Sequence, residues 1–197
     1  FFKAAGYTWD EASGKFTAAP EGAKMSYEVI VPASGGEDHP AYLLCEYVRQ
    51  ALDSIGITLV INNPSDDNVI WNALNANTEE MWTAAWSSSI DPDMYQTWHS
   101  KNVVGAPGST GSNHAYLIDE QLDQLIMDAR VSPDQEYRKA IYKECLDIIK
   151  DWGVEVPYYQ RQEMYVVSAE RVNVDTITPD VTPYWNWMND IQNMEMN

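Results

Sequence analysis

The stretch from Trp82 to Pro92 carries the side chains best suited to binding a small polar ligand. An apolar run there leads into a tryptophan, three hydroxyl groups and an Asp-Pro turn. In α/β proteins, ligands bind beyond the carboxyl ends of strands, where aromatic surface and hydrogen-bonding groups meet. We therefore predict non-covalent ligand binding at this strand end, by Trp86, Ser87, Ser88 and Ser89.

The same residue types also have a purely structural interpretation. The serines fit a simple polar loop, and Asp91 before Pro92 is typical of a turn whose side chain hydrogen-bonds to local backbone. Asp91 and Asp93 are too close along the chain to face each other across a glycosidic bond. Tryptophans are mostly core residues, and we expect this of three that lie on helix or strand stripes: Trp71, Trp82 and Trp152.

Sequence signatures of common catalytic sites are absent: there is no GxSxG, HExxH, P-loop or GxGxxG pattern. None of the three histidines has a second His or a Cys three or four residues further on, so we predict no metal site. His39 is expected to begin a helix, and His99 and His114 lie in a predicted loop region. We expect no cofactor and no enzymatic activity.

The formal net charge of −18, from 30 acidic against 12 basic residues, argues against two classes of partner. Nucleic acid and anionic membrane surfaces are both repelled by such a surface. No run of 18 apolar residues is present, so no segment is predicted to span a bilayer.

Cys45 and Cys145 both fall on predicted amphipathic helices among apolar neighbours. Each is expected to be a small buried hydrophobe, and a disulfide between them remains open. Their spacing favours neither a zinc site nor a redox dithiol.

The first half of the chain has the pattern of a βαβ unit. A strand is predicted over 25–31, a helix from Pro40 to Ile55, and a buried strand over 57–61. Such a crossover places the two strands parallel. A shorter helix is predicted over 66–74 and a further strand over 81–86.

The second half is predicted to be mainly helical. A short aromatic helix around Tyr95 and a glycine-rich loop over 105–111 precede a helix that starts near Asp119. The next helix is expected to have Ser132 as its N-cap, Pro133 as its first residue and Gln135 at the capping-box position, and to end at Gly153. A strand is predicted over 164–167. At the other end of the chain, Phe1 to Tyr7 looks like the last turn of a helix, so we expect the parent protein to be longer.

Taken in order, these pieces resemble the C-terminal lobe of bacterial extracellular solute-binding proteins of family 5, which serve peptide and nickel ABC importers. The resemblance covers most of residues 1–168. It rests on the order and spacing of Ala5-Gly6-Tyr7, Trp86 with Asp91-Pro92, Ser112-Asn113, Asp119 to Ile126, Tyr137-Arg138 to Ile149, and Val156-Pro157-Tyr158.

The resemblance implies an α/β fold, namely a type II periplasmic-binding-protein-like lobe with a βαβ unit and a mixed sheet flanked by helices. Residues 1–168 would form the C-terminal ligand-binding lobe, and residues 169–197 a crossover segment and tail toward a missing N-terminal lobe. A peptide or similar small solute would be trapped between the lobes and delivered to membrane permease subunits. The protein would be extracellular or periplasmic, anchored to the cell envelope as a lipoprotein through an N-terminal segment absent from this chain.

For the site, the resemblance implies ligand contacts from Trp86, Ser87, Ser88, Ser89, Asn113 and Tyr116, with Asp91 and Pro92 forming a structural turn. Peptide-binding members place a carboxylate shortly after the tryptophan to hold the ligand's amino group. Here Ser89 stands at the comparable position, so such a salt bridge is not implied. Arg138, on an amphipathic helix, is expected to be a structural ion-pair partner.

Two other functions are compatible with the sequence. Abundant aromatic and acidic residues also suit a glycan-binding module or a carbohydrate-active enzyme. A purely structural interaction domain would show no pocket at the Trp86 strand end.

Overall fold

The computed structural model describes residues 1–86, 90–160, 162, 164–179, 181–182 and 184–197. The chain divides into two compact units. The first holds residues 1–86 and 96–120, and the second holds the described residues of 87–95 and 121–197. Among the described residues, no helix combines the length and apolar composition needed to cross a membrane.

A three-stranded parallel sheet forms the centre of the first unit. Strand β3 (Ser26–Ile30) lies between β4 (Thr58–Asn62) and β5 (Met81–Trp82). The predicted βαβ unit with parallel strands is confirmed. The prediction of a strand as far as residue 86 is wrong, because β3 ends at Ile30 with Pro32 close behind, and little strand remains for the chain after Trp82 to pair with.

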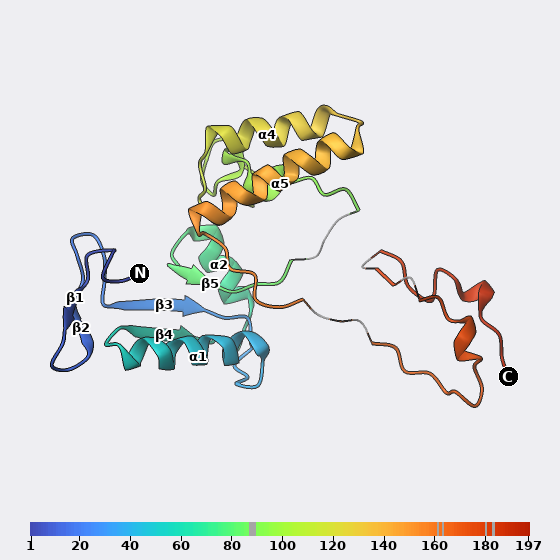
Figure 1. Ribbon diagram of the computed structural model, residues 1–197, viewed down its shortest axis with the longest axis horizontal. Coiled ribbons are helices and arrows are strands. Elements are labelled where there is room, and N and C mark those ends of the chain that lie inside the picture. The colour runs from blue at the N-terminus through green and yellow to red at the C-terminus, as the bar shows by residue number, and fades with distance from the viewer. Residues whose placement is uncertain (87–89, 161, 163, 180, 183) are drawn as a thin grey trace. The chain divides into compact units, whose positions relative to one another are not determined.

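Helices cover the two faces of this sheet, as the alternation of side chains along β3 requires. Helix α1 (Pro40–Ser54) packs through Cys45 against Val29, Val31 and Leu59, and lies along the sheet in Figure 1. Helix α2 (Asn68–Ala76) packs against the other face, where Ile30 contacts Ile70 and Leu74.

The two longer helices of this unit begin beside polar side chains that accept hydrogen bonds from backbone amides. His39 begins α1 as predicted, because its Nδ1 atom accepts a hydrogen bond from the Ala41 amide at 3.2 Å. Helix α2 starts two residues later than expected, since Asp66 Oδ1 accepts from the Asn68 amide at 2.9 Å before the helix begins.

An antiparallel hairpin, β1 (Thr8–Asp10) with β2 (Lys15–Ala18), forms a separate small sheet. Phe16 of β2 and Tyr7, which directly precedes β1, are buried with their rings edge-on and pack on Ile57, which precedes β4. We call these three residues the aromatic corner. Gly56 lies directly against this corner at φ +86°, and a Cβ atom there would meet the Phe16 carbonyl oxygen at 2.6 Å. The junction therefore requires glycine.

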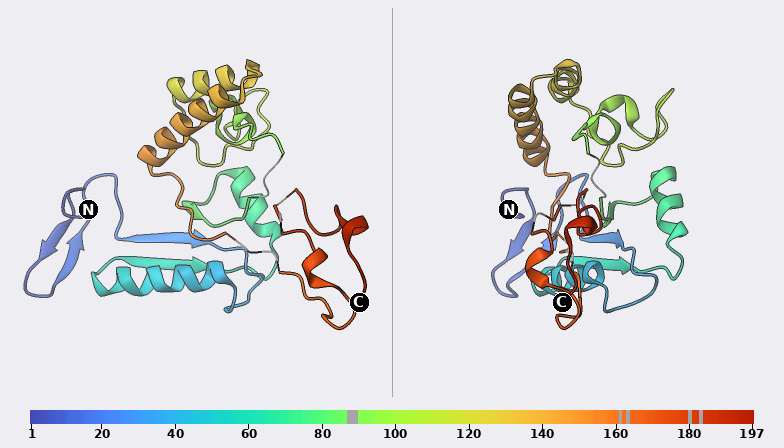
Figure 2. Two further views of the ribbon diagram at one scale, coloured as in Figure 1. Left: turned by 45° about the vertical axis from the view of Figure 1, so that its right-hand side comes forward. Right: turned by 90° about the vertical axis from the view of Figure 1, so that its right-hand side faces the viewer.

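The second unit is built around two helices that run side by side, α4 (Glu120–Val131) and α5 (Gln135–Trp152) (Figures 1 and 2). The N-cap of α5 is Asp134, which accepts hydrogen bonds from the Glu136 and Tyr137 amides. The prediction of Ser132 as N-cap is wrong, because its hydroxyl accepts from the Asp134 amide instead and so precedes the helix. Gly153 ends α5 at φ +67°, as expected.

The remaining helical segments are short: α3 (Tyr95–Trp98) and the 3₁₀ turns Ser100–Asn102, Val174–Thr176 and Ile191–Asn193. The predicted strand over 164–167 is wrong, since those residues carry no strand. Trp71 and Trp152 are exposed rather than core, because their helices turn other residues inward, Ile70 and Leu74 in α2 and Cys145 and Ile149 in α5.

Cys45 and Cys145 are both buried and both free. Burial raises the pKa of Cys45, and it raises the pKa of Cys145 to about 11. The prediction of two small buried hydrophobes is confirmed.

Candidate ligand-binding strand end

Trp86 lies four positions beyond the end of β5, past the carboxyl edge of the parallel sheet. Its side chain is 55% exposed, so the indole remains accessible to a partner. Ser87, Ser88 and Ser89, which complete the predicted site, lie outside the described residues. Trp82, the last residue of β5, is half-buried beside α2.

Asn113 is completely buried and holds together the loop that follows α3. Its side-chain amide donates to the carbonyl oxygens of Leu117 at 3.0 Å, Trp98 at 3.3 Å and His99 at 3.4 Å. Its Oδ1 atom has no hydrogen-bond partner among the described residues. That oxygen is buried as well, so the structure gives Asn113 a role in holding this loop.

Tyr116 has a left-handed backbone conformation, with φ at +53°. Its hydroxyl donates to the Val104 carbonyl oxygen at 3.2 Å, within the same loop. The structure gives this side chain a loop-stabilising contact, and its role toward a ligand stays a prediction.

His114 connects this loop to the strand end. Its ring stands edge-on to Trp82, with ring centroids 6.2 Å apart. Burial lowers the pKa of His114, although a hydrogen bond with the Leu74 backbone acts in the opposite direction. The imidazole is therefore mostly neutral at pH 7. Sequence reasoning placed His114 in a loop region but did not predict its contact with Trp82, because that contact depends on β5 and the loop meeting in space.

Asp91 and Asp93 each pair with an arginine of the helical unit. Asp91 Oδ1 lies 2.6 Å from Arg138 Nη2, and Asp93 Oδ2 lies 3.1 Å from Arg130 Nε. The four side chains line a cavity of about 250 Å³. The predicted ion-pair role of Arg138 is confirmed. Asp91 was expected to hydrogen-bond to local backbone as a turn former, and the structure shows that its side chain also pairs with Arg138 of α5.

A cavity of about 360 Å³ lies in the first unit, at the amino end of its parallel sheet. It was not predicted from the sequence. Glu28, Glu79 and Glu80 line it, and Lys24 forms an ion pair with Glu80. Burial and the neighbouring charge of Glu28 raise the pKa of Glu79. Among the described residues, no group of three or more His, Cys, Asp or Glu side chains is arranged to hold a metal ion.

Comparison with known proteins relates this fold to solute receptors. No family model matches the chain. Di/tripeptide-binding protein 2 of Pseudomonas aeruginosa (strain UCBPP-PA14) is 27% identical over 146 residues, which are 74% of this chain and 26% of that protein.

Two solved structures have the same fold at low identity. NikZ from Campylobacter jejuni, in complex with Ni(L-His), superposes with a TM-score of 0.58 at 18% identity, over 75% of this chain and 28% of that one. The ABC transporter-associated periplasmic binding protein DppA from Helicobacter pylori, in complex with the peptide STSA, gives a TM-score of 0.52 at 21% identity, over 63% of this chain and 23% of that one.

The resemblance to receptors for peptides and nickel, and the α/β fold that it implies, are confirmed by these likenesses. The chain spans about a quarter of the length of the proteins it matches. The proposed boundary at residue 168 and the ligand contacts remain predictions.

Proposed function

We propose that this chain is the C-terminal ligand-binding lobe of an ABC importer's solute-binding protein, belonging to family 5. In this proposal, a peptide or similar small solute is captured between this lobe and an N-terminal lobe, and is passed unchanged to membrane permease subunits. The protein works outside the cytoplasmic membrane, anchored to the cell envelope, and is not an enzyme.

The observation that carries the proposal is the exposed Trp86 indole just beyond the carboxyl end of β5. Carboxyl ends of parallel strands are where α/β folds bind ligands, and an exposed aromatic face offers a large contact area at low entropic cost. The similarity to a di/tripeptide-binding protein and to a receptor solved with a peptide favours peptide as the solute.

The contacting residues proposed here are Trp86, the three serines that follow it, and Tyr116, with the completely buried Asn113 holding the loop that carries Tyr116. Serine hydroxyls can pair with the backbone groups of a peptide without selecting its side chains. This arrangement would suit a receptor that accepts peptides of varied sequence.

Calorimetric titration of the full-length receptor tests the proposal. We expect saturable heat with dialanine or trialanine, and only weak binding to this chain alone, because a ligand held by one lobe stays hydrated on its other side. Maltotriose and nickel–histidine serve as comparison ligands.

A response to maltotriose or nickel–histidine with none to peptides would contradict the choice of peptide. Hydrolysis of a chromogenic glycoside by the purified protein would contradict the non-enzymatic proposal. Loss of that hydrolysis in Asp91→Asn would then locate the acid.

A further inference from the structure

The loop after α3, residues 99–117, carries a set of hydrogen bonds within itself. Asn113 donates from its side chain to three carbonyl oxygens at or next to the ends of the loop, and from its backbone amide to the Asn102 carbonyl oxygen at 2.9 Å. Tyr116 is joined by its hydroxyl to Val104 of the same loop. These bonds set the internal shape of the loop and do not attach it to the sheet.

His114 connects this loop to the sheet of the first unit. Its ring lies edge-on to Trp82 of β5, and a hydrogen bond joins it to the backbone of Leu74, near the end of α2. Its Nδ1 atom is buried and has no hydrogen-bond partner among the described residues. The bond to Leu74 raises the pKa, as donation to a carbonyl oxygen does, so Nε2 carries the proton of the neutral ring.

This arrangement suits a neutral imidazole and disfavours an imidazolium. A second proton would bind Nδ1, where it would create a charge and a hydrogen-bond donor in a buried position without a partner. Burial lowers the pKa of His114 for the same reason. The stabilisation that the neutral ring gives to the attached loop is therefore fully present above the ordinary pKa of 6.5, and is lost as the pH falls through the lower folded value.

Among the described residues, no neighbouring charge contributes to the pKa of His114, which follows from burial and from the Leu74 backbone. Helix α2 has no titratable side chain, and neither residue of β5 is titratable. The titratable groups nearest along these elements are Glu79 and Glu80 before β5, and His99, Lys101 and Tyr116 on the loop. A proton on His114 is thus not balanced by a facing carboxylate.

We propose that His114 is a pH-sensitive anchor of the loop after α3: as a neutral ring it holds the loop against Trp82 and the end of α2, and its protonation releases the loop and weakens ligand binding. The effect on the ligand rests on the proposed function, because Tyr116 lies on this loop and the chain runs from Trp82 to Trp86. Ligand would be held at neutral pH and released in an acidic environment.

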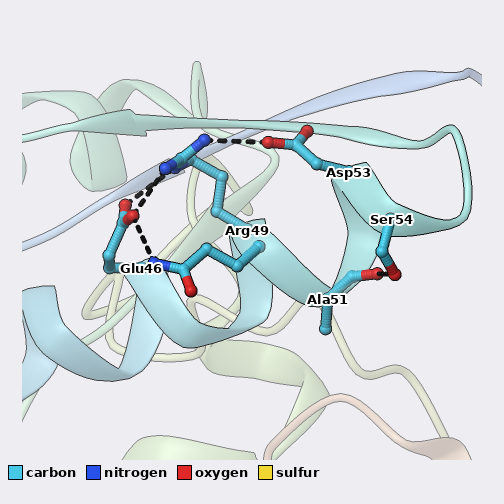
Figure 3. A network of polar contacts seen from close by, with 6 residues as sticks. Glu46, Arg49, Ala51, Asp53 and Ser54 are labelled. Carbon is cyan, nitrogen blue, oxygen red and sulfur yellow. Dashed lines mark hydrogen bonds and ion pairs between the residues drawn. The ribbon is translucent and has the colours of Figure 1, made fainter.

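Helix α1 offers an internal reference within the same unit. Arg49 donates to Glu46 Oε2 at 2.7 Å and to Asp53 Oδ2 at 2.8 Å, as Figure 3 shows. Hydrogen bonds from Arg49 and Gln50 lower the pKa of Glu46 to about 2, so this carboxylate stays ionised at pH 5. Acid that protonates His114 should therefore leave this part of α1 unchanged.

The test uses the full-length receptor at pH 7 and pH 5, unaltered and as His114→Gln, with His39→Gln as the matched control. Glutamine at position 114 keeps a donor for the Leu74 backbone and takes up no proton. His39 also lies in the first unit, but its Nδ1 atom has a partner, the Ala41 amide. Hydrogen–deuterium exchange over 103–117, corrected for the intrinsic effect of pH, and the Kd for trialanine are measured for all three. NMR titration of the histidine rings in the unaltered receptor gives the pKa of His114 directly.

We expect faster exchange over 103–117 at pH 5, and a Kd weaker by about threefold or more, in the unaltered receptor and in His39→Gln. Both should stay nearly constant in His114→Gln, and exchange over 46–54 should stay constant in all three.

The same response to pH in His114→Gln as in the unaltered receptor would overturn the anchor. So would a His114 ring that titrates at 6.5 or above, a measurement that needs no variant. A loop that is released while the Kd stays constant would overturn the link to the ligand. A receptor that binds no peptide at either pH, while exchange still follows His114, would overturn the proposed function and leave the anchor standing.

Discussion

The aromatic corner of the first unit and the Asp91–Tyr95 turn of the second are held by different forces. At the corner, Tyr7, Phe16 and Ile57 are at most 8% exposed, and their side chains are in direct contact. In the turn, Asp91 is 62% exposed and is held by charge. Packing fixes the first region and ion pairs fix the second.

This difference separates stability from positioning. Tight apolar packing tolerates little change in volume, so substitutions at the corner should lower the free energy of unfolding. Exposed ion pairs contribute little to that free energy, so substitutions in the turn should mainly affect where it lies. Along the chain, Trp86 follows the sheet and comes before the charged turn.

Gly56→Ala should break the packed region most strongly. A methyl group at φ +86° would meet the Phe16 carbonyl oxygen at 2.6 Å, so we expect a loss of about 1–3 kcal/mol. Urea unfolding measures it. Gly14→Ala is the control, because Gly14 also has a positive φ, at +65°, but has open space where its Cβ would lie. Equal losses in the two variants would show that close packing at the corner is unimportant.

Asp134→Ala should have the next largest effect, in the helical unit that holds the turn. Its carboxylate accepts from two amides at the start of α5, so its loss should cost about 1 kcal/mol. Ser132→Ala should cost clearly less, since its hydroxyl accepts only from the Asp134 amide among the hydrogen bonds described for it. Chemical denaturation ranks the two variants, and the reverse order would contradict this helix start.

Glu79→Gln should have the smallest effect on the free energy of unfolding. It tests whether a charged group also influences stability in the first unit. Because the folded state raises the pKa of Glu79, folding favours its protonated form. This group's stabilisation is fully present below its ordinary pKa of 4.5 and is lost as the pH rises through the higher folded value. Stability curves against pH should therefore fall less steeply above pH 4.5 in the variant. Parallel curves would contradict the shift.

The local elements of the sheet unit could be predicted from sequence. Pro40, Gly56 and the apolar periodicity between them set α1 and the start of β4 within a residue or two. The length of β5 could not be predicted from sequence, because it depends on where its partner strand β3 ends. Ser132 and Asp134 are both good N-cap residues, and only the course of the backbone selects between them.

The candidate site was predictable only in part. The apolar run predicted Trp86 as the last residue of a strand, whereas β5 ends four residues earlier, at Trp82. The pairs of Asp91 with Arg138 and Asp93 with Arg130 join residues far apart in sequence, and no local pattern marks them. The hollow beside Glu79 likewise exists only because β3 and β5 become neighbours.

Trp86 and Trp152 provide the most direct test of ligand binding at the strand end, because each is 55% exposed and only Trp86 follows β5. The measurement is the Kd of the full-length receptor for trialanine in Trp86→Ala and in Trp152→Ala. We predict a loss of about tenfold or more for Trp86→Ala, as for an aromatic residue central to a binding surface, and a change of less than about twofold for Trp152→Ala. Equal changes in the two variants, or an unchanged Kd in Trp86→Ala, would contradict ligand binding at this strand end.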